Sequence, residues 1–264
     1  MDFKSLGLRT DLIFHRFGAQ VSDRGDYVAI RTASRPDYLW GNCILIRRFG
    51  AADSADHWIR IFEREIGSRK ETGFMTFAWD DPTGSAEHIT PFLDLGFKLS
   101  TSTIFTATAV RRPSAYNDDF VVRPLESDAD WEQYLDVHFS KDWGYGSLED
   151  QHRFNLAQRD SLRAMVQAGI GMRYGAFLGD CLVAELGIYW DRDVARFNNV
   201  GTRASHRRRG ACSTLVYEAS KATFSDMKRK TLVLEALSGG EAARLYGTVG
   251  FTPSQQLCKV EWLA

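Results

Sequence analysis

The chain has 264 residues, of which 44% are hydrophobic and 25% are charged. This composition is that of a globular protein, and the length suits one large domain or two modest ones. The formal net charge of -1 gives no electrostatic reason to expect nucleic acid or an anionic membrane as the main partner.

The cysteines and the N-terminus exclude further classes of protein. Cys43, Cys181, Cys212 and Cys258 lie far apart without any CxxC spacing. Neither a zinc site nor a disulfide framework is indicated, so we expect reduced thiols in the cytoplasm and no bound metal. Charged residues interrupt the apolar residues of segment 1–20, so we expect neither a signal peptide nor a membrane span there.

In the first half, strands are predicted at Asn42–Ile46 and Phe74–Trp79, with an amphipathic helix around residues 58–66 between them. Residues 89–106 resemble residues 242–260 in the type and order of their side chains, which favours a diverged domain duplication. Segment 111–119 is polar and contains Pro113, and such a segment is typical of a linker that does not pack. We therefore place the boundary near Pro113, giving domains 1–113 and 114–264.

The second half has a clear order of elements. The pattern predicts a strand at 120–124, a helix capped by Ser127 or Asp128 that runs through Phe139, and a second helix over roughly Leu148–Gln167. Strands follow at 172–178, 181–190 and 195–202, then a helix after Gly210, a strand at 231–236, a helix ended by Gly250, and a final strand. This order describes a mixed α/β fold in which a mostly antiparallel sheet is flanked by helices.

The strongest local signal lies between a predicted strand and a predicted helix, at residues 202–213. Backbone N–H groups at a helix start have no intrahelical partner and lie at the positive end of the helix dipole, so they can donate together to a pyrophosphate. Small side chains allow close approach and arginines add charge-assisted contacts. The predicted phosphate-binding residues are Arg207, Arg208, Arg209, Gly210, Ala211, Cys212 and Ser213. The alternative is an exposed basic turn that merely starts a helix.

With Arg207, Gly210 and Cys212 in the places of an Arg/Gln-x-x-Gly-x-Gly/Ala loop, residues 120–264 resemble the GNAT N-acyltransferase superfamily. Cys212 departs from the usual Gly or Ala. The resemblance implies acetyl-CoA as cosubstrate, held where strand 195–202 separates from strand 231–236. It also implies that the pantetheine arm pairs with the main chain of the strand end, at Val200, Gly201 and Thr202.

The resemblance further implies two tandem GNAT-like domains, the first a degenerate copy that walls the acceptor site. Phe92 stands where the second copy has Tyr246, and Phe92 has no hydroxyl. Arg47, Gly50 and Ala52 match the short loop pattern, but the acidic residues Asp53 and Asp56 follow at once.

Tyr246 occupies the position from which, by this resemblance, a tyrosine protonates the departing CoA sulfur. Direct transfer also needs a deprotonated amine, so a group must accept a proton. Glu235 is the first candidate for this base and Glu185 the second; ordinary salt-bridged glutamates and a water chain are the alternatives. His138, Trp143 and Tyr145 are candidates for an aromatic acceptor pocket or for ordinary packing.

These features predict an acetyl-CoA-dependent N-acetyltransferase acting on a small amine or an amino-acid-like acceptor. Two other functions stay open: a sensor that binds acyl-CoA without turnover, and a transferase that uses aminoacyl-tRNA. The near-zero net charge gives the latter little support. The oligomeric state, monomer or homodimer, is left open.

Overall fold

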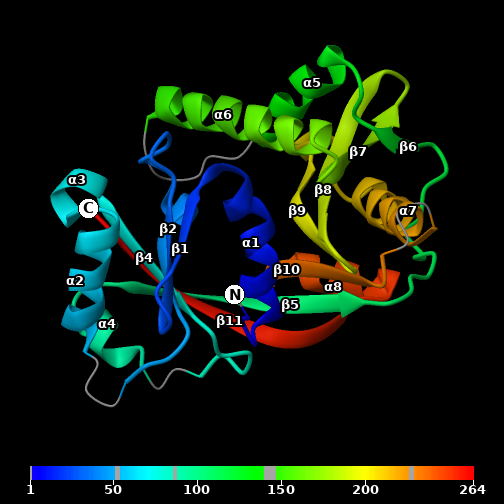
Figure 1. Cartoon of the computed structure of the whole chain (residues 1–264). Helices are drawn as coiled ribbons and strands as arrows, with labels where there is room; N and C mark the ends of the chain where they lie inside the picture. Colours follow the sequence, from blue (N-terminus) through cyan, green and yellow to red (C-terminus); the bar gives the residue numbers. More distant parts are fainter. Residues whose placement is uncertain (1, 51–53, 86–87, 140–146, 226–228) are drawn as a thin grey trace. The chain divides into compact units, whose positions relative to one another are not determined.

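The computed structural model in Figure 1 describes residues 2–50, 54–85, 88–139, 147–225 and 229–264. The chain separates into two compact units. The first comprises Met1–Ile104, Glu235–Ser238 and Pro253–Ala264, and the second comprises Phe105–Leu234 and Gly239–Thr252. Each unit combines a mixed, mostly antiparallel sheet with helices, which confirms the predicted fold class.

The strands of the first unit lie in the order β1-β2-β3-β4-β11-β5. They are β1 (Gln20–Asp23), β2 (Tyr27–Arg31), β3 (Asn42–Ile46), β4 (Phe74–Trp79), most of β11 (Thr252–Leu263) and most of β5 (Lys98–Ala107). The helices are α1 (Leu6–Gly18), the short 3-10 turn η1 (Leu39–Gly41), α2 (Ala55–Glu65), α3 (Arg69–Thr72) and α4 (Thr90–Asp94). β3 and β4 pair in parallel, as consecutive strands joined by a crossover helix do.

Helix α2 forms because its apolar side chains recur at helical spacing. Trp58, Ile61 and Phe62 share one face and are at most 7% exposed, and Ser54 caps the helix by accepting from the backbone N–H of His57. This face belongs to the same buried core as Phe77 of β4. All residues of β3 are buried, so both faces of the sheet are covered there.

The C-terminal strand β11 corrects the predicted domain boundary. Segments 235–238 and 253–264, which the boundary near Pro113 assigns to the second domain, belong to the first unit. The physical reason is strand pairing, because β11 runs antiparallel to β4 from Lys259 opposite Ala78 to Leu263 opposite Phe74. The chain therefore returns to complete the sheet of its first half.

His15 of α1 is a buried titratable group in the first unit. Burial and, second, the charge of Lys259 lower its pKa from 6.5 to about 4. Between pH 6.5 and pH 4 the unfolded chain protonates His15 more readily than the folded chain does. The stability that His15 contributes is therefore fully present above pH 6.5 and is lost as the pH falls toward 4. We expect the free energy of unfolding to fall by about 2 kcal/mol from pH 7 to pH 5 through this group. Urea unfolding at the two pH values measures the fall.

The matched variant for this prediction is His15→Leu, which removes the titrating imidazole from α1 and puts an apolar side chain in the same buried position. The pH dependence of unfolding should become shallower by the same amount. An identical pH dependence of unfolding in the two proteins would show that groups other than His15 cause it.

The second unit has the strand order β10-β9-β8-β7-β6. Its strands are β6 (Val121–Pro124), β7 (Gly171–Leu178), β8 (Cys181–Asp191), β9 (Val194–Thr202) and the start of β10 (Thr231–Leu237); its helices are α5 (Asp128–Phe139), α6 (Leu148–Gln167), the 3-10 turn η2 (Ala204–His206), α7 (Ala211–Ser225) and α8 (Glu241–Val249). The predicted meander is confirmed, with β7, β8 and β9 antiparallel and a tight turn at Gly179. Within this unit, Figure 1 shows α5 and α6 on one side of these strands and α7 on the other.

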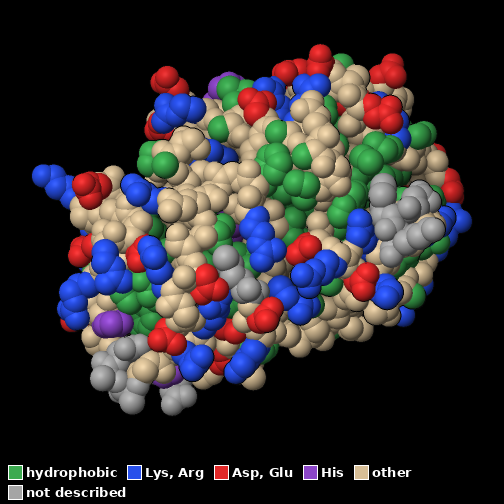
Figure 2. All heavy atoms as spheres, in the orientation of Figure 1, with side chains coloured by type: hydrophobic (Ala, Val, Ile, Leu, Met, Phe, Trp, Pro, Cys, Tyr) green, Lys and Arg blue, Asp and Glu red, His purple; other side chains and the backbone are tan. Residues whose placement is uncertain are grey.

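Acidic and basic side chains lie interspersed over the face shown in Figure 2, in keeping with the small net charge. Among the described residues, no helix combines the length and the apolar composition needed to cross a bilayer.

Candidate functional site

The predicted phosphate loop joins β9 to α7 in the second unit. After η2, Arg208 and Gly210 both adopt positive φ, at 59° and 86°, and the helix begins at Ala211. This turn leaves Arg207, Arg208 and Arg209 exposed. The backbone thus turns abruptly into the helix while its basic side chains stay in solvent.

Gly210 is required here on steric as well as conformational grounds. A Cβ atom at this position would lie 2.3 Å from the carbonyl oxygen of Ala115. Asn117 braces the same turn, because its side-chain amide donates to the Arg209 carbonyl at 3.0 Å and its backbone N–H donates to Thr214 Oγ1 at 2.9 Å. The segment around Ala115 and Asn117 is therefore a structural support of the loop.

This support corrects the expectation that segment 111–119 fails to pack. Besides Asn117, the Tyr116 hydroxyl donates to Glu218 of α7 at 3.0 Å, and the Tyr116 and Tyr217 rings meet edge to face at 5.8 Å. Sequence reasoning missed these residues because their local composition is that of a linker. The positive φ required at Gly210 gives no hint of which segment lies against it.

The start of α7 has the geometry of an anion site. The first intrahelical hydrogen bond runs from the Thr214 N–H to the Gly210 carbonyl at 2.9 Å. The N–H groups of Ala211, Cys212 and Ser213 precede it, so no carbonyl of the helix is available to them. They lie at the positive end of a helix of 15 residues, beside exposed arginines. This combination suits a diphosphate.

Strand β9 carries a bulge and then separates from β10. Glu185 pairs with Gly201 and Gly187 with Asn198, so β9 has one extra residue, with Asn199 and Val200 both opposite Leu186. Asn199 has a φ of 48°. Pairing of β9 with β10 is recorded only from Val194 to Arg196. Among the described residues of the second unit, Val200, Gly201 and Thr202 therefore pair with β8 or lie at its bulge and have no strand partner on their other edge. Such a strand edge offers N–H and C=O groups to an extended ligand.

A buried ion pair supports this bulge. Arg173 of β7 and Glu185 of β8 are both fully buried, with 2.5 Å between Arg173 Nη2 and Glu185 Oε2. The other edge of the guanidinium donates to Asn198 Oδ1 and to the Asn199 carbonyl, each at 3.4 Å. Arg173 thus ties three strands together where β9 bulges. The predicted base Glu185 lies inside this network, without contact to solvent.

Tyr246 lies in the same unit, on α8, which packs against α7. It is 5% exposed, and its ring meets Phe105 and Phe251 edge to face at 6.2 and 6.3 Å. Within the described residues, its hydroxyl has no hydrogen-bond partner. Burial and, second, the nearby thiol of Cys212 raise the pKa of the phenol above its ordinary value. The hydroxyl therefore keeps its proton and lies close to the start of α7.

The remaining predicted site residues belong to the first unit or lie outside the described residues. Glu235 belongs to the first unit, where it accepts a hydrogen bond from Lys259 Nζ at 2.8 Å. Trp143 and Tyr145 lie outside the described residues, as does the side chain of His138. In the first unit, Arg47 is bound to Asp23 at 2.7 Å, and Phe92 is a core residue.

Solved structures with the same fold include acetyltransferases. A GCN5-related N-acetyltransferase from Kribbella flavida is similar over 98% of this chain and 96% of its own, with a TM-score of 0.69 and 14% identity. A functionally unknown conserved protein from Staphylococcus epidermidis is similar over 92% of this chain and 93% of its own, with a TM-score of 0.69 and 11% identity.

A tandem GNAT protein from the clavulanic acid biosynthesis pathway is similar over 96% of this chain and 87% of its own, with a TM-score of 0.55 and 9% identity. No protein-family model matches the sequence, and no match was found among curated proteins. The chain therefore has the fold of the GNAT N-acetyltransferases, as the resemblance in sequence implied. Identities this low establish the fold alone.

Proposed function

We propose that the second unit binds acetyl-CoA and transfers its acetyl group directly to the amine of a small molecule or an amino-acid-like acceptor. The observation that carries this proposal is the start of α7, where three exposed arginines directly precede Gly210 and backbone amides that have no acceptor within the helix. Tyr246, with a protonated hydroxyl, lies beside the same helix start.

The binding roles follow from these positions. The backbone amides of Ala211, Cys212 and Ser213 hold the diphosphate of the cosubstrate, and Arg207, Arg208 and Arg209 add charge-assisted contacts. Val200, Gly201 and Thr202 pair with the pantetheine arm, because that edge of β9 has no strand partner among the described residues of the second unit. No metal takes part in this scheme.

Acetyl-CoA supplies the acetyl group as a reactive thioester. The acceptor nitrogen forms a bond to the thioester carbon, the carbon–sulfur bond breaks, and the sulfur leaves with the bonding electrons. Tyr246 donates its hydroxyl proton to that sulfur and recovers a proton from solvent. At reference pKa values this transfer is uphill by about 2 kcal/mol, and the raised pKa of the buried Tyr246 phenol adds to that cost, so the proton must pass as the sulfur leaves and not before.

The proton lost by the amine needs a different acceptor. Glu185 is buried in an ion pair with Arg173, and Glu235 is bound to Lys259 in the first unit. Both glutamates are thereby already engaged by basic side chains. We therefore favour water, the alternative to a carboxylate base, as the acceptor of this proton.

Isothermal calorimetry with acetyl-CoA tests the binding step. The wild type should bind, and Gly210→Ala should bind at least about tenfold more weakly, because a Cβ atom 2.3 Å from the Ala115 oxygen displaces the turn. Gly179→Ala is the matched control, since Gly179 also has positive φ but faces open space. Absence of binding up to millimolar acetyl-CoA would rule out the proposal.

A sensor that binds acyl-CoA without turnover is the second candidate, favoured by the ion pairs of both glutamates. Release of CoA thiol in the presence of a panel of small amines separates the two functions. Turnover with any amine rules out the sensor; binding without turnover across the panel supports it.

A further inference from the structure

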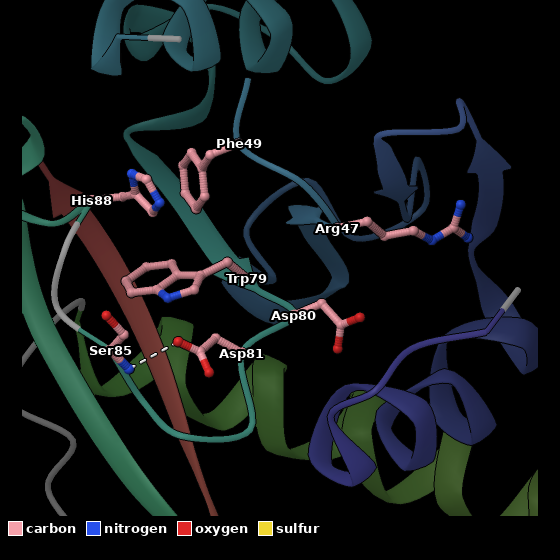
Figure 3. A pocket seen from close by; sticks show the side chains of 7 residues that line it. All are labelled: Arg47, Phe49, Trp79, Asp80, Asp81, Ser85 and His88. Carbon is pink, nitrogen blue, oxygen red and sulfur yellow. Dashed lines mark hydrogen bonds between the residues drawn. The ribbon is translucent and has the colours of Figure 1, made fainter. Parts of the chain in front are cut away.

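The first unit contains a pocket of its own, at the ends of the parallel strands β3 and β4. Its volume is about 160 Å³. Arg47 and Phe49 follow β3, and Trp79, Asp80 and Asp81 end and follow β4. Ser85 and His88 complete the lining, as Figure 3 shows.

Aromatic rings form one side of this pocket. Phe49 and His88 stack with 4.0 Å between ring centroids and 23° between planes, and Phe49 meets Trp79 edge to face at 6.2 Å. Trp58 supports Phe49 from the core at 5.8 Å. The ring faces carry partial negative charge, so this wall attracts cations.

Two carboxylates provide negative charge at the pocket, and Figure 3 shows that of Asp81 beside Trp79 and that of Asp80 directed away from the rings. Asp80 accepts from the backbone N–H groups of Lys4 and Ser5, at 2.9 and 2.6 Å. Asp81 accepts from the Thr83 N–H and hydroxyl and from the Ser85 N–H, at 2.8, 2.7 and 3.0 Å. All these donors are neutral. In the described part of the chain, no basic side chain lies within 4.0 Å of either carboxylate.

The basic residue in the lining does not neutralise this charge. The Arg47 guanidinium donates to both oxygens of Asp23, at 2.7 and 2.8 Å, and to the Gly25 carbonyl at 2.8 Å. Figure 3 shows the end of its side chain directed away from Trp79 and His88. The pocket therefore holds two carboxylates with no basic side chain of the described residues in direct contact, while the charges of Arg47 and Lys4 act on Asp80 and Asp81 from a longer distance. This arrangement disfavours a phosphate or another anion.

Trp79 adds a hydrogen-bond donor without an acceptor. The residue is only 4% exposed, and among the described residues its indole N–H has no hydrogen-bond partner. Figure 3 shows the indole nitrogen on the side of the ring that faces Asp81 and Ser85. A ligand in this pocket gains from offering an acceptor atom to the indole.

We propose that this pocket binds a small organic ammonium ion that also carries a hydrogen-bond acceptor, as an amino alcohol does. The ammonium group lies against Phe49 and His88 beside the carboxylates, and the acceptor meets the Trp79 N–H. The volume is sufficient, because an engineered cavity of about 150 Å³ admits benzene. The site lies wholly in the first unit and is independent of acetyl transfer.

Calorimetry with choline and its neutral isostere 3,3-dimethylbutan-1-ol tests the charge requirement. Choline should bind at least about tenfold more tightly than the alcohol, because only choline gains the cation–π and carboxylate attraction. No acetyl-CoA is present, so the outcome does not depend on the proposed transferase function. Equal affinity for the two compounds, or binding of neither, would overturn the proposal.

Variants then place the binding in this pocket. Asp81→Asn keeps the oxygen that accepts from Thr83 and should lower choline affinity about tenfold while leaving the alcohol unchanged. Asp94→Asn removes the same charge from an exposed position on α4 and should have no effect. Because His88 is exposed, His88→Ala should fold normally and also weaken choline binding. Unchanged choline affinity in both Asp81→Asn and His88→Ala would overturn the proposal.

The role of the indole has its own control. Trp79→Phe keeps an aromatic ring but removes the N–H donor. It should weaken choline and leave tetramethylammonium, which has no acceptor atom, nearly unchanged. Equal loss for both cations would show that the indole N–H does not contact the ligand.

Discussion

Replacing Tyr246 with phenylalanine is expected to lower kcat for acetyl transfer by about a hundredfold or more, because a positioned general acid contributes roughly 10²–10⁴-fold. The affinity for acetyl-CoA should change little, since the ring and its contacts with Phe105 and Phe251 are retained. Single-turnover kinetics with an amine that the wild type acetylates measure the rate of transfer. Calorimetry measures the affinity for acetyl-CoA separately.

The control is Tyr217→Phe, which makes the same chemical change on α7, at a residue whose ring meets Tyr116. It should leave kcat unchanged. A similar fall in both variants would show a general loss of structure, and full activity in Tyr246→Phe would exclude this hydroxyl as the acid.

The pH dependence of the reaction provides a related check. Burial raises the pKa of Tyr246, so the folded protein keeps the phenol protonated at a pH where an exposed tyrosine ionises. Activity should therefore not decline through ionisation of Tyr246 as the pH approaches 10. A decline near that pH that disappears in Tyr246→Phe would contradict the assignment of its environment.

The loop between β9 and α7 could be predicted from the sequence because its signal is local. A strand, a run of arginines, a glycine and an amphipathic helix follow one another within residues 194–225, and each obeys short-range rules. The meander before it was predictable for the same reason, since a two-residue turn at Gly179 links alternating strands. Local patterns thus predicted the order of elements in the second unit and the turn that joins β9 to α7.

What escaped prediction depends on contacts distant in sequence. The pairing of β11 with β4 joins residues 259–263 to residues 74–78, and no local pattern chooses β4 over another strand as partner. The support of Gly210 by Ala115 arises in the same way. The patterns in residues 1–41 gave no prediction of α1, although Ser5 caps it and Leu8 and Leu12 are fully buried.

The roles of the two candidate bases, Glu185 and Glu235, also depend on contacts distant in sequence. A glutamate in a strand looks alike in sequence whether it faces a substrate or a basic partner. Glu185 became a buried partner of Arg173 because β7 and β8 place the two side chains together, and Glu235 pairs with Lys259 because β11 joins the first unit. Tyr246 could be assigned more readily because the glycine after its helix fixed its place in the pattern.

The second large effect is expected at the buried ion pair. Arg173→Met should lower the free energy of unfolding by about 3–5 kcal/mol, because it leaves the Glu185 carboxylate buried without its partner. Urea unfolding measures this loss. Arg123→Met is the control, since it breaks a pair with Asp130 in which the arginine is 42% exposed, and it should cost less.

The double variant Arg173→Met/Glu185→Leu separates two effects of the ion pair, its effect on the free energy of unfolding and its effect on the shape of the bulge in β9. Removing both charges should recover most of the lost stability, because an apolar pair can replace a buried ion pair at little cost. Asn198 and the Asn199 carbonyl still lose their contact with the guanidinium, so the β9 edge should be held less firmly. We therefore expect weaker acetyl-CoA binding in a stably folded protein. Wild-type affinity in the double variant would show that the bulge keeps its shape without Arg173.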